Sequence, residues 1–247
     1  MSILKIKNLK KIYHTKQNET LAVDNFSLNL NEGEFIAIVG PSGCGKSTIL
    51  SILCGLDKAS SGTIELKKGL KIGYMLQGDN LFEWQTIYKN CLLGLEINKK
   101  NTKKNKKYVK SLLKTYGLEE FMNAHPSNLS GGMRQRVSLI RTLATKPDLL
   151  ILDEPFSALD YQSRLAVSDD VYKIIKKEKK SAIMVTHDIS EAISMADKVI
   201  VLSKRPSIIK KIYKINLTNK SNPINNRKAK EFSKYYDLIW KDIDYHV

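Results

Sequence analysis

Short apolar segments separated by polar turns suggest a fold in which strands and helices alternate. Some segments are almost wholly aliphatic, which is typical of strands buried on both faces of a sheet; they span residues 35–39, 149–152, 181–185 and 199–202. Stretches with helical periodicity lie between them, as in residues 162–177. This alternation predicts an α/β core built on a parallel sheet.

The beginning of the chain shows a different pattern, in which apolar and polar side chains alternate one by one. Residues 4–12, 21–23 and 26–30 follow it and are separated by polar turns, as expected for antiparallel strands with one buried face. An antiparallel β portion is therefore expected before the α/β core. After the first predicted helix, residues 63–66 and 71–75 are expected to form two further short strands.

Helical segments and a change of composition divide the chain further. Residues 86–95 and 108–116 are amphipathic and predict a small helical subdomain within about residues 86–145. The main domain is expected to cover residues 1–215. Residues 216–247 are expected to form a polar linker and a short tail helix that is basic and aromatic.

Composition places the chain among globular proteins, with 42% hydrophobic and 27% charged residues. No apolar run approaches the roughly 18 residues of a membrane span. The cysteines, Cys44, Cys54 and Cys91, show no metal-type spacing, and the first residues lack an apolar signal segment, so a reducing cytoplasm is expected.

The net charge of +16 is unusual. The lysines are seldom interleaved with aromatic residues, so we attribute the charge to compositional bias and proximity to a membrane rather than to nucleic acid. Residues 98–107 hold six lysines and are interpreted as a solvated loop or the start of a helix.

A phosphate-binding loop follows the first buried strand. Residues 40–47 match G-x-x-x-x-G-K-[ST], and residues 49–53 continue as a helix. Glycines in such a loop point backbone N–H groups at phosphate oxygens, and the helix N-terminus adds partial positive charge. Lys46 is expected to reach the β- and γ-phosphates of ATP, and the Ser47 hydroxyl to ligate Mg²⁺. The expected ATP-binding residues of the loop are Gly40, Pro41, Ser42, Gly43, Cys44, Gly45, Lys46, Ser47 and Thr48.

Other strands end in polar residues that suit phosphate chemistry. Asp153 and Glu154 follow the strand 149–152, and because side chains alternate along a strand, they face different surroundings. One is expected to support Mg²⁺ and the other to face the attacking water. His187 ends the next buried strand and is a candidate sensor of the γ-phosphate. Ser130 is expected to cap a helix running to about residue 145.

Together these residues resemble the ATP-binding subunit of ABC transporters, with six motifs in the family's order between residues 4 and 202. Tyr13 occupies the place of the family's adenine-stacking aromatic residue. The motifs are Walker A at Gly40 to Ser47, the Q-loop at Gln77, the signature at Leu129 to Gly132, Walker B at Leu149 to Glu154, the D-loop at Ser157 to Asp160 and the switch histidine His187. The resemblance implies an α/β P-loop NTPase core with an N-terminal antiparallel β portion and a small helical subdomain.

The resemblance also implies the roles of the site residues. ATP would be sandwiched in a head-to-tail dimer, between the Walker A loop of one subunit and the signature of the other. Glu154 would be the general base for water, and His187 would contact the γ-phosphate. By the same resemblance, Mg²⁺ is held by Ser47, Gln77 and Asp153, the signature contacts ATP through Ser130, Gly131 and Gly132, and the D-loop contributes Asp160.

The implied partners are a second ATPase subunit, identical or paralogous, two integral membrane permease subunits and, indirectly, an extracytoplasmic solute-binding protein. The subunit would lie peripherally on the cytoplasmic face of the cell membrane, and no nucleic acid is expected. Leu81, Phe82 and Trp84 form an apolar cluster after the Q-loop. Trp84 is the stronger candidate for a permease contact, whereas Leu81 and Phe82 fit a packing role equally well.

The cargo is less closely specified. Residues 129–136 and 199–206 look like those of nitrate, sulfonate and taurine importers. Glu83 stands where that group has proline, and Ile140-Arg141 replaces Ala-Arg, which loosens the substrate assignment and leaves the ATPase assignment intact. An importer of a thiamine-precursor-like heterocycle remains an alternative, as does a soluble ABC ATPase acting on the ribosome or nucleic acid.

Overall fold

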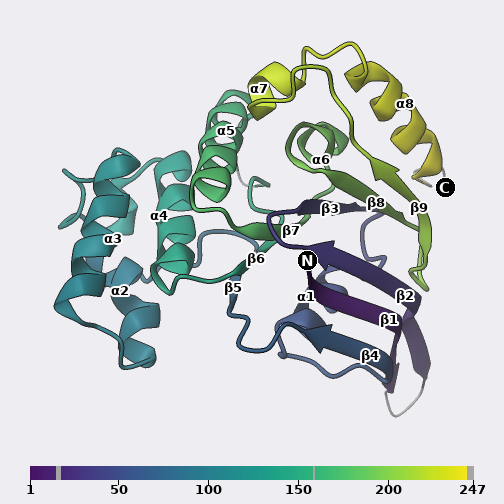
Figure 1. The fold of residues 1–247 in the computed structure, drawn as a ribbon. Coiled ribbons are helices and arrows are strands. Elements are labelled where there is room, and N and C mark those ends of the chain that lie inside the picture. Colours follow the sequence, from purple (N-terminus) through teal and green to yellow (C-terminus); the bar gives the residue numbers. More distant parts are fainter. Residues whose placement is uncertain (15–17, 158, 244–247) are drawn as a thin grey trace.

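Two β-sheets organise the part of the chain that the computed structural model describes, residues 1–14, 18–157 and 159–243 (Figure 1). The smaller sheet has the strand order β2-β1-β4 and is antiparallel throughout. It comprises β1 (Ser2–His14), β2 (Glu19–Asn31) and β4 (Ser61–Leu66). The expected antiparallel portion is therefore confirmed.

The larger sheet has the order β5-β6-β7-β3-β8-β9 and forms the α/β core. All of its neighbouring strands pair in parallel except β8 and β9, which are antiparallel. Its strands are β3 (Phe35–Val39), β5 (Ile72–Met75), β6 (Leu149–Asp153), β7 (Ser181–Val185), β8 (Lys198–Leu202) and β9 (Ile209–Lys214).

Alternate residues of β3 face two separate hydrophobic cores, which explains why this strand is apolar without interruption. Ile36 and Ile38 pack with the antiparallel sheet and α1 (Lys46–Leu53). Ala37 and Val39 pack on the opposite face, with apolar residues of α5 (Tyr161–Lys177) and α6 (Ile189–Met195). Both faces of β3 are therefore packed against hydrophobic side chains directly before the phosphate loop begins.

A helical lobe extends from the β5 edge of the sheet (Figure 1). Thr102 accepts a hydrogen bond from the backbone N–H of Asn105, so the second helix of the lobe begins at Lys103, earlier than the expected Tyr108. Ser130 caps the third helix through the N–H of Met133, as expected. The lobe consists of α2 (Ile87–Ile97), α3 (Lys103–Thr115), the 3₁₀ turn Pro126–Asn128 and α4 (Gly131–Ala144).

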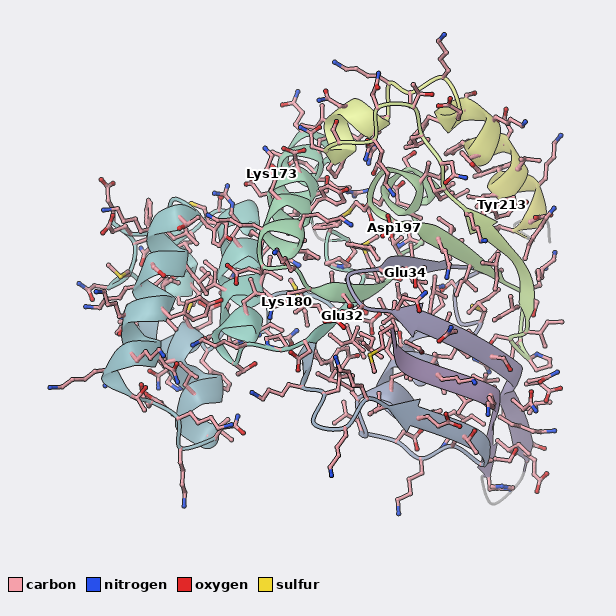
Figure 2. The ribbon with its side chains drawn as sticks, in the orientation of Figure 1. Glu32, Glu34, Lys173, Lys180, Asp197 and Tyr213 are labelled. Carbon is pink, nitrogen blue, oxygen red and sulfur yellow. The ribbon has the colours of Figure 1, made fainter. Side chains whose placement is uncertain are left out.

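The segment after β9 packs against the core (Figure 2). Lys220 donates a hydrogen bond to Asp197 (2.7 Å), and the Tyr213 hydroxyl of β9 donates to Asp242. Ile239 is fully buried. The segment contains α7 (Pro223–Asn226) and α8 (Phe232–Asp242), so the tail helix begins later than residue 227. None of the helices within the described ranges is both long and apolar enough to cross a bilayer.

Asn90 of α2 fixes the loop that links the Q-loop to the helical lobe. Its side chain is fully buried and accepts a hydrogen bond from the N–H of Phe82 (2.8 Å). Its amide nitrogen lies 3.1–3.2 Å from the carbonyl oxygens of Phe82, Gln85 and Thr86. A buried amide that satisfies several backbone groups holds the loop in one conformation.

Replacing Asn90 with alanine is expected to lower the free energy of unfolding by about 2–3 kcal/mol, because the N–H of Phe82 loses its partner. Urea denaturation measures this loss. Asn98→Ala, at the exposed end of the same helix, removes a single bond to the Gly94 carbonyl and is the control, with an expected loss below about 0.5 kcal/mol. Equal losses in the two variants would contradict the anchoring role of Asn90.

Candidate functional site

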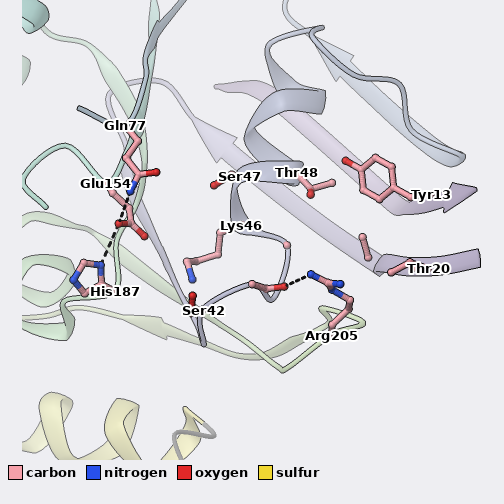
Figure 3. A pocket seen from close by; sticks show the side chains of 13 residues that line it. Tyr13, Thr20, Ser42, Lys46, Ser47, Thr48, Gln77, Glu154, His187 and Arg205 are labelled. Atoms are coloured by element: carbon pink, nitrogen blue, oxygen red, sulfur yellow. Dashed lines mark hydrogen bonds and ion pairs between the residues drawn. The ribbon is translucent and has the colours of Figure 1, made fainter. Parts of the chain in front are cut away.

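A pocket of about 490 Å³ opens where β3, β6 and β7 end. Parallel strands present their carboxyl ends at the same edge of a sheet, and ligands of α/β folds bind there. Most predicted site residues meet in this pocket (Figure 3). It is lined by Tyr13, Thr20, Ala22, Ser42, Gly43, Gly45, Lys46, Ser47, Thr48, Gln77, Glu154, His187 and Arg205.

The phosphate loop leaves β3 and enters α1, as its sequence predicts. At Gly45 the backbone φ is +118°, and a Cβ atom would lie 3.0 Å from the Ala22 carbonyl oxygen and 3.1 Å from Ser207 Oγ. Both the conformation and the close approach require glycine there. The buried Lys46 ammonium donates hydrogen bonds to the carbonyls of Gly40 (2.8 Å) and Pro41 (2.9 Å).

Four of the predicted ATP-binding residues, Gly40, Pro41, Cys44 and Asp153, are not among the residues that line the pocket. Cys44 is buried in the core beneath the loop, and burial raises the pKa of its thiol. The thiol is therefore neutral at pH 7 and contributes to packing. Gly40 lies against Cys44 Sγ and Leu202, where a Cβ atom would approach both within 3.1 Å.

Asp153 does not line the pocket itself but contacts Ser47, which does. It is 5% exposed, and burial raises the pKa of its carboxyl. Ser47 Oγ donates to its Oδ1 (3.4 Å), and the Tyr74 hydroxyl donates to its Oδ2 (3.2 Å). Ser47 and Asp153 thus present neighbouring oxygen atoms, the donor type that Mg²⁺ prefers, so the residues fit the expected ion.

Glu154 points into the pocket from the residue after β6. Its φ is +45°, in the left-handed region that a glutamate rarely adopts, and its N–H donates to the Val185 carbonyl (2.9 Å). Its Oε2 atom lies 3.3 Å from Nδ1 of His187 and 3.4 Å from Nε2 of Gln77 (Figure 3). Strained backbone conformations concentrate at functional sites. The three predicted catalytic side chains therefore form one cluster.

Tyr13 forms the opposite rim of the pocket. Its hydroxyl donates to Asp57 (2.9 Å), and Lys11 Nζ lies 4.6 Å from the centre of its ring. The side chain is 39% exposed, which leaves an aromatic surface at the pocket. Thr20, the β-sheet partner of Tyr13, and Arg205 also line the pocket, and the sequence analysis did not assign either to the site.

The signature lies outside this pocket. Ser130 is exposed at the start of α4, and Gly132 packs so closely on Val167 of α5 that a Cβ atom would lie 3.1 Å away. Asp160 is exposed and caps α5 by accepting from the N–H of Ser163 (3.0 Å). Ala158 of the D-loop falls outside the described residues. A single chain therefore does not bring its own signature to its phosphate loop.

The loop after Gln77 is tied to α4. Arg134, two residues beyond the signature, donates to Asp79 (2.7 Å) and to Glu83 (2.5 Å). Phe82 and Trp84 stack with ring centres 4.8 Å apart. Trp84 is 73% exposed, whereas Leu81 is buried. The apolar cluster thus divides into an inner part, at Leu81, and an outer aromatic part.

A buried acid supports the strand end that carries His187. Thr186 donates a hydrogen bond to Glu191 (2.6 Å), which is 3% exposed. Arg164 Nε lies 3.7 Å from the Glu191 carboxylate, and its Nη2 donates to the Leu159 carbonyl (2.9 Å). Burial is the main cause that raises the pKa of Glu191 to about 7.

Comparisons with known proteins agree with this geometry. The sequence profile of a family described as ABC transporter matches residues 23–157. An uncharacterized ABC transporter ATP-binding protein of Bacillus subtilis is 41% identical, and the alignment covers 99% of this chain and 96% of the relative. A nitrate import ATP-binding protein of a Synechocystis species is 37% identical, with coverage of 96% and 93%. A solved dimer of an ATP-binding cassette in a post-hydrolysis state with ADP and Pi has 31% identity and a TM-score of 0.72, covering 87% of this chain and 99% of that one.

The buried Glu191 generates a testable pH dependence. Below pH 4.5 its carboxyl is protonated in the folded and unfolded chain alike, so it costs no stability. As the pH rises from 4.5 to about 7, the unfolded chain releases the proton while the folded chain retains it. The free energy of unfolding therefore falls across this window, by on the order of 3 kcal/mol, and the loss stays constant above it.

Glu191→Gln is expected to remove this loss, so the variant gains stability relative to the parent between pH 4.5 and pH 7. Urea denaturation at several pH values measures the difference. Glu120→Gln, which changes an exposed acid, is the control, and its difference from the parent is expected to stay flat. A pH-independent difference for Glu191→Gln would show that this carboxyl titrates alike in both states.

Proposed function

The chain belongs to the ABC transporter family as an ATP-binding and ATP-hydrolysing subunit, and from this premise we propose that it powers the import of a small solute across the cytoplasmic membrane. The observation that carries the proposal is the convergence of the phosphate loop, Gln77, Glu154 and His187 on one pocket. Such a pocket supplies both halves of the chemistry, a phosphate cradle and a positioned carboxylate.

ATP is bound between Tyr13 on one side of the pocket and the phosphate loop on the other. Tyr13 stacks on the adenine ring, and the backbone N–H groups of the phosphate loop bind the phosphates. Lys46 exchanges its bonds to the carbonyls of Gly40 and Pro41 for bonds to the terminal phosphates. Mg²⁺ would be held by the oxygens of Ser47 and Asp153 and would supply positive charge that stabilises the phosphates.

Hydrolysis depends on the cluster around Glu154. Its carboxylate accepts a proton from the attacking water, because general bases act from hydrogen-bond distance of the proton that they remove. Gln77 and His187 contact the same carboxylate oxygen and hold the side chain in the pocket. His187, which lies beside this carboxylate, also contacts the γ-phosphate.

The complete site requires a second subunit. Ser130, Gly131 and Gly132 lie outside the pocket of their own chain, at a helix N-terminus suited to bind an anion. In a head-to-tail dimer, identical or paralogous, this signature covers the ATP held by the partner. The similar ATP-binding cassette with ADP and Pi is itself dimeric, which supports the arrangement.

Two permease subunits complete the transporter, which makes this subunit a peripheral protein of the cytoplasmic membrane face. Exposed aromatic side chains are frequent hot spots of protein interfaces, so Trp84 and its partner Phe82 form the expected docking surface. The cargo is chosen by the permease and an extracytoplasmic binding protein. The resemblance of residues 129–136 and 199–206, together with the nitrate-import relative, favours nitrate, a sulfonate or taurine.

Glu154→Gln tests the catalytic assignment. The amide keeps the shape of the side chain but does not accept the proton, so turnover is expected to fall on the order of 10²- to 10⁴-fold while ATP binding persists. Steady-state ATPase assays and nucleotide titration measure the two properties. Lys46→Ala is the comparison, because it is expected to lose binding as well. Hydrolysis by Glu154→Gln at the parent rate would rule out Glu154 as the base.

Trp84→Ala tests the docking surface. The isolated variant is expected to fold and bind ATP, but its association with the permease subunits weakens, by roughly 2 kcal/mol or more if Trp84 is a hot spot. Co-purification with detergent-solubilised membranes measures this. Trp240→Ala removes the other tryptophan, which is 45% exposed on α8, and serves as the matched control.

The same experiment separates the transporter from a ribosome- or RNA-acting ATPase. If the protein were a ribosome- or RNA-acting ATPase, it would associate with ribosomes in a salt-sensitive way, and neutralising the lysines between residues 99 and 107 would abolish that association. Such an association, indifferent to Trp84, would overturn the proposed function.

A further inference from the structure

The turn between β8 and β9, residues 203–208, forms a rigid shelf beside the phosphate loop. Within the turn, Ser203 Oγ lies 2.8 Å from the Lys204 carbonyl oxygen and 3.0 Å from that of Pro206, which share its single proton, and it accepts from the N–H of Ile208 (3.0 Å). A turn whose backbone groups are paired with a side chain of the turn itself has little freedom to move.

The shelf is also joined to β2. Ser207 is fully buried, its N–H donates to the Ala22 carbonyl (3.0 Å), and its carbonyl accepts from the N–H of Asp24 (3.0 Å). Ala22 and Ser207 together form the surface against which Gly45 packs. The turn therefore keeps a constant position relative to the phosphate loop.

Arg205 projects from this shelf into the pocket. Its Nη2 atom donates to the Gly43 carbonyl at the tip of the phosphate loop (2.8 Å), and the side chain is exposed. In Figure 3 the guanidinium lies between the phosphate loop and Thr20, on the Tyr13 side of the loop, whereas Lys46 lies on the side of Glu154. Two cationic side chains, Arg205 and Lys46, therefore line the pocket, and Arg205 lies on the side of the Tyr13 ring.

A guanidinium carries several N–H donors in a planar fork, so a bond to a carbonyl oxygen does not exhaust it. Arginine also stays charged at every physiological pH. An anion bound against Gly43 on the Tyr13 side would therefore meet a fixed positive charge. In a nucleotide whose base stacks on Tyr13 and whose terminal phosphates reach Lys46, the anionic group in between is the α-phosphate.

We propose that Arg205 is a nucleotide-binding residue that holds the α-phosphate. The inference rests on the proposed binding of ATP in this pocket and adds a contact that none of the six motifs contains. Because AMP, ADP and ATP all carry the α-phosphate, the contact strengthens the binding of all three, whereas a contact to the β-phosphate would leave AMP unaffected. A residue that only anchored the phosphate loop through Gly43 would act on the empty protein instead.

The test compares Arg205→Gln, which removes the charge, with Arg205→Lys, which keeps it. Lys204→Gln is the matched control, since it removes a charge from the neighbouring position, which does not line the pocket. Calorimetric titration gives the Kd of each variant for AMP, for ADP and for a non-hydrolysable ATP analogue. Thermal unfolding without nucleotide and with saturating ADP gives the ligand-induced shift in Tm.

Arg205→Gln is expected to weaken the binding of all three nucleotides by about tenfold, as for the loss of one charge-assisted hydrogen bond. Arg205→Lys is expected to stay within about threefold of the parent, and Lys204→Gln within about twofold. The Tm without nucleotide is expected to be unchanged, and the shift induced by ADP to be smaller.

Parent-like Kd values for Arg205→Gln would overturn the inference. Weakened binding of the ATP analogue alone would also overturn it by placing the charge at the γ-phosphate, and weakened binding of ADP and the analogue with unchanged binding of AMP would do so by placing the charge at the β-phosphate. A lower Tm without nucleotide, combined with an unchanged shift on adding ADP, would assign Arg205 to loop anchoring instead. Failure of the parent protein to bind ADP and the ATP analogue would overturn the proposed function itself. These outcomes are distinct, so the two proposals can fail separately.

Discussion

Parallel pairing of β3, β6 and β7 is the constraint on which the site depends. Ile38 pairs with Val185, and Val185 pairs with Asp153, so the three strands reach the same edge in step. The residues that follow them, the phosphate loop, Glu154 and the segment leading to His187, are therefore brought to the same edge by the register of the sheet. Side-chain contacts then adjust a cluster whose position the sheet has already set.

Much of the fold and most of the pocket were predictable because their signals are local. The strand 181–185 has the predicted bounds, and Ser130 caps its helix as its neighbours indicate. The first residue of a helix was less predictable where an N-cap side chain determines it, as Thr102 does for α3. The structure also brings Gln77, Glu154 and His187, which the motifs and the family resemblance singled out, to one pocket.

The remaining site residues were not predictable because long-range packing places them. Arg205 meets Gly43 across 162 positions of the chain, and nothing in its own turn marks it as a pocket residue. The hydroxyl of Tyr74 reaches Asp153 across 79 positions. Glu83 looked like a departure from the family pattern, and the structure gives it a partner in Arg134. Periodicity and motifs carry no information about such pairs.

The paired contacts of Arg134 have a consequence for communication within a dimer. The loop that carries Trp84 is connected to Gln77 at its own nucleotide pocket and, through Asp79 and Glu83, to the helix that begins with the signature. In the proposed dimer that signature serves the other nucleotide. A displacement of this loop by a permease would therefore affect both Gln77 at the hydrolytic site of the same chain and the signature that covers the nucleotide of the neighbouring subunit. Movement of one permease loop contact would thus affect both ATP sites of the dimer.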